Sequence, residues 1–292
     1  MSTTFTRLAI PLSLIGFFLS QPAEADTFFF STGNPDGAIA TASRPASAGK
    51  IEIESADDFV LTGGTAITSA TFTGLLPAGE PLTDVNEVRI EIYRVFPTDS
   101  DTVRTPNVTT RANSPSDVEL DDRDSAGGGL TFTTGLVQGS FTAANSVLNG
   151  IHPFPNELTN GEGGVTGQEV QFNASFATPF TLPAGHYFFV PQVELASGDF
   201  LWLSAPRPIA SPGTELPPGV TDLQSWIRNE DLAPDWLRVG SDITAQGPFN
   251  AAFTLSGSTV PEPSTWALML LGLAALGLPH FGRRAKAFFA VT

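Results

Sequence analysis

The sequence predicts a mainly β protein: an antiparallel β-sandwich or jelly-roll-like domain with an apolar segment at each end. Between residues 26 and 260, short apolar runs are separated by Gly, Pro, Asn and Asp, the pattern of short strands joined by turns. The chain has 23 Phe against 2 Tyr and 2 Met, and most of the Phe falls in these runs. It has no cysteine, so burial of apolar side chains has to stabilise the fold without disulfides.

The first 25 residues form a predicted signal peptide. Arg7 precedes an apolar run from Leu8 to Leu19, and Ala23 and Ala25 stand at the small-residue positions that signal peptidase reads. A buried N-terminal helix is the alternative, but Pro11 and the short run disfavour it. We therefore expect export through the Sec machinery and cleavage after Ala25.

Residues 26–257 form the predicted β domain. The clearest strand is EVRIEIYRV, in which Val88, Ile90 and Ile92 alternate with Arg89, Glu91 and Tyr93, as in a strand with one buried face. The sequence LPAG, at 76–79 and 182–185, predicts turns. The other predicted strands cover 50–54, 57–61, 66–75, 129–134, 169–176, 186–195, 200–205, 236–240 and 249–257.

Residues 97–129 are predicted to form a long mobile acidic loop, because they combine many acids and turn formers with little apolar content. Closely spaced acids can bind calcium, which prefers six to eight oxygen ligands. Asp121, Asp122 and Asp124, with Asp117 and Glu119 nearby, are the candidate ligands, although their spacing is not that of an EF-hand. A solvated acidic loop without metal is the favoured alternative, and no other cofactor is expected.

The charge of the middle region argues against a nucleic-acid partner. Of the 14 basic and 30 acidic side chains, 10 and 28 lie between residues 26 and 260, a formal charge of −18. Such a field repels nucleic acid and attracts cations.

The sequence offers no catalytic motif. HExxH and GxSxG are absent, and without cysteine there is no thiolate nucleophile. Two carboxylates at a fixed separation would suffice for a glycosidase, but 28 acids leave the pair undetermined. Asp57 and Asp58 could bind a cation at a strand start, although backbone hydrogen bonding is the more common role of such residues. We expect a protein that is not an enzyme.

Two tryptophans are candidate sugar-contacting residues. Trp226 and Trp236 flank a charged, turn-rich segment, so exposed indole rings could stack on sugars there, although burial of both rings is the favoured alternative. Trp202 lies between Leu201 and Leu203 and is expected in the core.

The C-terminal region is predicted to be a linker at 258–264 followed by a hydrophobic helix with a basic tail at 265–292. Residues 265–278 carry no charge and would span about 21 Å as a helix, less than a hydrocarbon core of about 30 Å. Arg283, Arg284 and Lys286 follow and should stay in the cytoplasm by the positive-inside rule. A marginal membrane helix that ends in a basic stop is expected.

This tail resembles the PEP-CTERM sorting signal of exported Gram-negative proteins. The resemblance is carried by Val260, Pro261, Glu262, Pro263 and Ser264, by Trp266, by the Leu/Ala/Gly run and by the arginine pair. It implies recognition by an exosortase, a membrane enzyme that processes the chain near the PEP motif. It also implies insertion in the inner membrane before processing, and release or attachment at the cell surface afterwards. The β domain is similar to uncharacterised β-rich ectodomains that precede such tails.

These observations predict an exported, non-enzymatic protein of the cell surface or of an extracellular polysaccharide matrix. A secreted carbohydrate-binding module is the first alternative, and a carboxylate-based glycosidase is the second.

Overall fold

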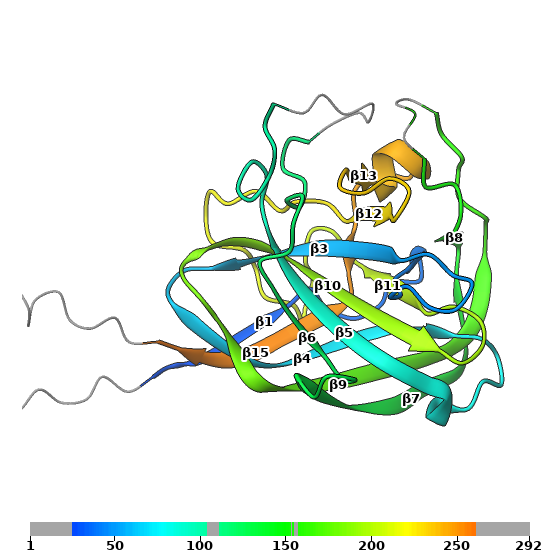
Figure 1. The fold of residues 1–292 in the computed structure, drawn as a ribbon, viewed down its shortest axis with the longest axis horizontal. Coiled ribbons are helices and arrows are strands. Elements are labelled where there is room, and N and C mark those ends of the chain that lie inside the picture. Colours follow the sequence, from blue (N-terminus) through cyan, green and yellow to red (C-terminus); the bar gives the residue numbers. More distant parts are fainter. Residues whose placement is uncertain (1–24, 104–110, 153, 155–156, 261–292) are drawn as a thin grey trace, which may run out of the picture.

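The computed structural model describes residues 25–103, 111–152, 154 and 157–260, which form two packed β-sheets (Figure 1). The mainly β, sandwich-like prediction is confirmed. The predicted signal segment and hydrophobic helix lie outside the described residues. Within these residues, no helix is long and apolar enough to cross a membrane.

The larger sheet has nine strands. β4 lies at its centre and pairs with β9 along one edge, and β9 pairs in turn with β7. Along its other edge, β4 pairs first with β15 and then with β11. β15 also pairs with β1, β11 also pairs with β2 and β14, and β2 pairs with β8. All pairs are antiparallel except β2 with β8. The bounds are β1 Thr27–Ser31, β2 Ile39–Ala42, β4 Thr65–Leu76, β7 Leu130–Ala143, β8 Asn145–Val147, β9 Val165–Leu182, β11 Leu201–Ala205, β14 Asn250–Ala251 and β15 Phe253–Thr259.

The smaller sheet has six strands in the order β13-β12-β3-β10-β5-β6, all antiparallel. The bounds are β3 Ile53–Leu61, β5 Val85–Arg94, β6 Asp121–Asp124, β10 Gly185–Leu195, β12 Trp226–Asn229 and β13 Leu237–Arg238. The described helical turns are η1 Leu82–Asp84, a 3₁₀ turn, and η2 Val239–Ile243, a π turn.

Phenylalanine rings fill the space between the sheets. Phe72 of β4 stacks on Phe172 of β9 with centroids 4.9 Å apart, and Phe189 of the smaller sheet stacks on Phe253 of the larger one at the same distance. Trp202 is buried among them, as predicted. A side chain at Gly74 would lie 2.2 Å from the ring of Phe200, so that ring packs directly on the β4 backbone.

Most predicted strands and both LPAG turns are present, with four differences. The segment 50–54 enters β3 only at its end, and the predicted 249–257 strand is split into β14 and β15. β15 continues to Thr259, so the domain ends two residues beyond the predicted boundary. The short strands β1, β2, β6, β8 and β12 were not predicted.

The prediction that residues 97–129 form a mobile loop is wrong for the part that the structure describes from residue 111 onward. β6 pairs with β5, and Ser114 and Ser116 are buried. The segment is ordered by its own charges: Arg111 pairs with Asp117, and Arg123 pairs with Asp121. The composition of the segment, rich in acids and poor in apolar residues, predicted too little burial, because composition does not show which charged side chains pair with one another.

Candidate functional site

The two ends of the β domain meet at one corner, where β1 and β15 lie side by side (Figure 1). The backbone N–H of Thr259 donates to the carbonyl of Asp26 at 2.8 Å, and the N–H of Asp26 donates to Thr259 Oγ1 at 2.9 Å. Ala25 and Val260, the outermost described residues, are both exposed. The predicted cleavage site and the predicted sorting motif therefore join the domain at the same point. The other residues predicted for them, Ala23, Pro261, Glu262, Pro263, Ser264, Arg283, Arg284 and Lys286, lie outside the described residues.

The candidate sugar-contacting tryptophans are both buried, in agreement with the favoured alternative, so they form no exposed stacking surface. Trp226 is 1% exposed and Trp236 is 2% exposed. The indole N–H of Trp236 donates to the carbonyl of Ser116 at 3.1 Å, because the segment after residue 111 crosses over it. The guanidinium of Arg228 lies 4.3 Å from the centre of the Trp236 ring, a cation–π contact.

These residues belong to the outer face of the six-stranded sheet, which we call the covered face. Its members are Glu54, Ala56, Glu91, Tyr93, Phe188, Val190, Trp226 and Arg228. The sequence pattern predicted that the Glu91 and Tyr93 side of β5 faces solvent, yet Glu91 is 6% exposed and Tyr93 is 1% exposed. Residues 111–117 and Trp236 cover this side, and we call them the lid. The alternation of polar and apolar residues within one strand cannot predict that another segment covers it.

A charged cluster lies at the centre of the covered face. Arg228 donates through both Nε and Nη2 to the Glu54 carboxylate, the second bond being 2.9 Å long, and Nη2 also donates to the Tyr93 hydroxyl at 2.8 Å. The Tyr93 hydroxyl lies 2.6 Å from Glu54 Oε1 and 3.1 Å from Glu91 Oε2. One cation, one phenol and two carboxyl groups thus share a water-excluded site.

The protonation states follow from burial. Burial, followed by the negative charge of Glu54, raises the pKa of Glu91 well above its ordinary value, so this group is neutral where an ordinary glutamate is charged. Burial acts to lower the pKa of Arg228, but Glu54 outweighs it and the net shift is upward, so the guanidinium stays charged. The cluster is therefore one Arg–Glu ion pair with a neutral glutamic acid beside it.

Glu54 and Glu91 resemble a catalytic acid–base pair, because one carboxyl group is charged and the other is neutral, but within the described residues neither of them lines a hollow that a substrate could enter. Glu54 is 3% exposed, and none of the described hollows is lined by either glutamate. Without contact to a substrate, the cluster holds the covering segments to the sheet, with Arg228 Nη1 donating to the carbonyl of Asp117 at 3.1 Å. Sequence reasoning missed this cluster because Glu54 and Arg228 are 174 residues apart.

Asp57 and Asp58 lie in the middle of β3 and point to opposite faces, so they form no common cation site. Asp57 is fully buried and accepts the backbone N–H of Ala251 at 2.8 Å. Asp58 pairs with Nε2 of His186 at 2.5 Å. Burial is the main cause that raises the pKa of both carboxyl groups. The interpretation of such residues as backbone partners is confirmed for Asp57.

The candidate calcium ligands each have a different environment. Asp121 pairs with Arg123, and Asp124 Oδ1 accepts the N–H of Gly127. Asp122 follows Asp121 on β6, and strand alternation places its side chain on the face opposite to that of Asp121. Over the described ranges, no group of three or more acidic or histidine side chains is placed to hold a metal. Calcium binding by these residues stays a prediction.

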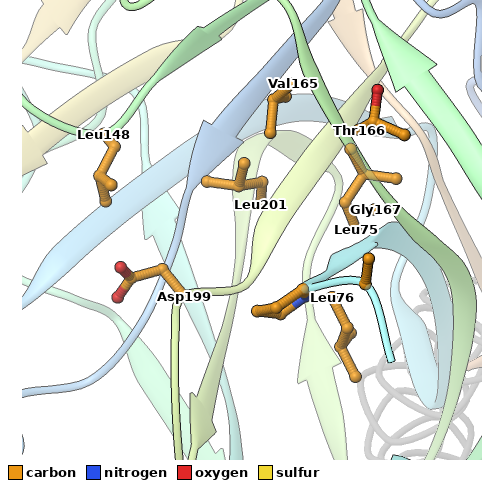
Figure 2. A pocket seen from close by; sticks show the side chains of 10 residues that line it. Leu75, Leu76, Leu148, Val165, Thr166, Gly167, Asp199 and Leu201 are labelled. Atoms are coloured by element: carbon orange, nitrogen blue, oxygen red, sulfur yellow. The ribbon is translucent and has the colours of Figure 1, made fainter. Parts of the chain in front are cut away.

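An apolar hollow lies between the ends of β4, β9 and β11 and has a volume of about 310 Å³ (Figure 2). Leu75, Leu148, Val165 and Leu201 line it, and Asp199 stands at its side. Asp199 is its only ionisable lining residue and is already paired with Arg44 at 3.0 Å and Lys50 at 2.9 Å. This hollow offers an apolar wall but no acid–base pair.

Comparison with known proteins bears on the C-terminal region. The family model described as the PEP-CTERM protein-sorting motif matches residues 259–286. No curated protein and no solved structure gives a significant match. The match begins at Thr259, the last residue of β15, so the signal follows the folded domain without a gap. The chain carries a PEP-CTERM sorting signal of the kind that exosortase-type enzymes recognise, and it is an exported protein sorted through its C-terminal region.

Proposed function

We propose that this protein is a non-enzymatic component of the cell surface or of an extracellular polysaccharide matrix. On this proposal signal peptidase cleaves after Ala25, the C-terminal segment holds the chain in the inner membrane, and an exosortase-type enzyme then processes it near Pro261, Glu262 and Pro263. The observation that carries the proposal is the sorting match that starts where β15 ends.

The corner at Asp26 and Thr259 supports this sequence of events. Cleavage after Ala25 would leave Asp26 as the new N-terminus, and its nitrogen already donates to Thr259 Oγ1. β1 would keep its pairing with β15 after cleavage. Because both ends leave from one corner, the domain could stay folded while the membrane holds either end.

The glycosidase alternative is less well supported. Its best pair of carboxyl groups, Glu54 and Glu91, is buried beneath Trp236 and residues 111–117. The carbohydrate-binding alternative loses its original surface with the burial of Trp226 and Trp236.

The proposal is tested by cell fractionation with three forms of the full chain: the wild type, Glu262→Gln in the sorting motif, and Glu215→Gln as a control. Glu215 is an exposed acid of the domain, so both substitutions remove one negative charge. We expect the wild type and the control at the cell surface or in the medium with a shortened C-terminus. Glu262→Gln should accumulate in the inner membrane with its tail intact. Recovery of all three forms uncleaved in the cytosol would contradict the proposal.

A further inference from the structure

The outer face of the nine-stranded sheet carries rows of uncharged polar side chains, and we call it the neutral face. Strand register aligns one row across five strands: Thr133, Asn173, Thr71, Thr254 and Ser31. The next row aligns Thr131, Ser175, Ser69, Ser256 and Phe29. Residues between these positions along the strands, such as Phe72, Phe172 and Leu255, point into the core. The polar rows therefore lie on the outer side of the sheet, which is exposed over β7 and β9, half-buried over β4 and β15, and buried at Ser31.

No ionisable side chain belongs to these rows, although the middle region carries 38 charged residues. The acid that follows along β9, Glu169, is 4% exposed, and burial raises its pKa. The face is thus uncharged on a protein with a large negative charge. Anionic polymers are repelled by the whole molecule, whereas an uncharged hydrogen-bonding polymer can approach this face without electrostatic cost.

A hollow of about 130 Å³ opens on the neutral face beside β1. Phe29, Asn34, Thr71, Thr73 and Gln171 are among its lining residues, and none of the residues that line it is charged. The Phe29 ring is 54% exposed, unlike the rings of the core. The hollow therefore combines an exposed aromatic ring with amide and hydroxyl groups.

Three polar side chains of this hollow have free hydrogen-bonding capacity, whereas the hydroxyls of Thr71 and Thr254 bond to each other at 2.6 Å. Thr73 is 7% exposed, and within the described residues its hydroxyl has no hydrogen-bond partner in the protein. The side-chain amides of Asn34 and Gln171 also make no hydrogen bond there. Because the Thr73 oxygen is not among the water-excluded polar atoms, its hydroxyl reaches the solvent in the hollow, where a ligand hydroxyl can replace the water that bonds to it.

We propose that the neutral face binds an uncharged polysaccharide, with one sugar residue in the hollow and the chain continuing over the polar rows. A sugar ring presents hydroxyl groups at its edge, which match Thr73, Asn34 and Gln171, and an apolar face, which packs against Phe29. A protein partner is less well matched, because the core of such an interface is apolar. The inference deepens the proposed function, on which it rests, by naming the class of matrix polymer that the protein contacts.

The test is affinity electrophoresis of the full-length protein in detergent, with dextran, xylan and a soluble β-glucan as neutral polymers and alginate as an anionic one. We expect at least one neutral polymer to retard the protein and alginate to have no effect. Phe29→Ala and Thr73→Val should each weaken the interaction about tenfold, a change of about 1.4 kcal/mol. Thr73→Val keeps the shape of the side chain and removes only the unpartnered hydroxyl.

Each variant has a matched control away from the face. Phe154→Ala removes another exposed ring, 61% exposed, and Thr159→Val removes another exposed hydroxyl; both should bind like the wild type. Retardation by no neutral polymer, stronger retardation by alginate, or equal binding by all variants would overturn the inference. Fractionation separates this result from the proposed function: Phe29→Ala should still be sorted and processed, whereas Glu262→Gln should bind the polymer but fail to be processed.

Discussion

The covered face and the neutral face are the outer surfaces of the two sheets, and they differ in both charge and exposure. The covered face carries charges and three large aromatic side chains, yet it is buried under residues 111–117 and Trp236. The neutral face carries hydroxyl and amide groups and is exposed over β7 and β9, although Ser31 and Thr73 are buried. In this molecule, the charged and aromatic outer positions form an internal layer, and the uncharged outer positions of β7 and β9 face the solvent.

The largest expected effect is on the covered face. Arg228→Ala should lower the free energy of unfolding by about 3–5 kcal/mol, because Glu54 would remain buried without its cation. Urea denaturation measures the change. Arg94→Ala, which removes a half-exposed partner of Asp99, should cost less than about 1 kcal/mol and is the control. Equal losses in the two variants would mean that water reaches Glu54 and that the face is not covered.

Replacing both members of the Arg228–Glu54 pair tests whether the loss of stability in Arg228→Ala comes from an unpaired buried charge. Arg228→Met combined with Glu54→Leu should recover a large part of the stability lost in Arg228→Ala, because no buried charge is left unpaired. A double variant as unstable as Arg228→Ala would show that lost packing, and not an unpaired charge, accounts for the effect.

A smaller effect than that of Arg228→Ala is expected on the pH dependence of the free energy of unfolding, through Glu91. The pKa of Glu91 is raised in the folded protein, so the folded state holds its proton over a pH range in which the unfolded chain has lost it. The contribution of this group is fully present below the ordinary glutamate pKa and is lost as the pH rises through the folded value, by up to about 1.4 kcal/mol per pH unit. Glu91→Gln should therefore flatten the decline above about pH 4.5 in urea denaturation at several pH values. Gln171→Asn on the neutral face should leave the pH profile unchanged, and an unaltered profile in Glu91→Gln would refute the assignment.

The smallest effect is expected on the neutral face. Phe29→Ala should change the free energy of unfolding by less than about 0.5 kcal/mol, because its ring contributes little to the core. Phe30→Ala, one residue along β1 and 3% exposed, should cost about 3 kcal/mol or more. Thermal or urea denaturation of this pair compares the two sides of one strand, and similar losses would mean that both sides are buried.

The sequence predicted the strands better than it predicted their surroundings. Alternation in β5 and the Phe-containing runs of β9 and β10 identified the sheets, because side-chain period and burial are local properties. The lid over Tyr93 and Trp226 was not predictable, because it depends on contacts between residues far apart in sequence, such as those of Arg228 with the Asp117 carbonyl and of Trp236 with the Ser116 carbonyl. The short strand β1 has no alternation, since TFFFS is aromatic at three successive positions.

The neutral face left a trace in the sequence that was not recognised. Ser69, Thr71 and Thr73 alternate with core residues in β4, and Gln171, Asn173 and Ser175 do so in β9. Each run alone is an ordinary half-buried strand. Only the register that places them side by side shows that the uncharged positions form one surface.

The central claim is that the neutral face is open to the surroundings and the tryptophan-bearing face is not. Hydroxyl-radical footprinting of the full-length protein tests it, with the oxidation rate of each side chain divided by its rate in the urea-unfolded chain. The account predicts a high relative rate for Phe29 and low relative rates for Phe30, Trp226 and Trp236. Rapid oxidation of Trp226 and Trp236 together with protection of Phe29 would contradict it.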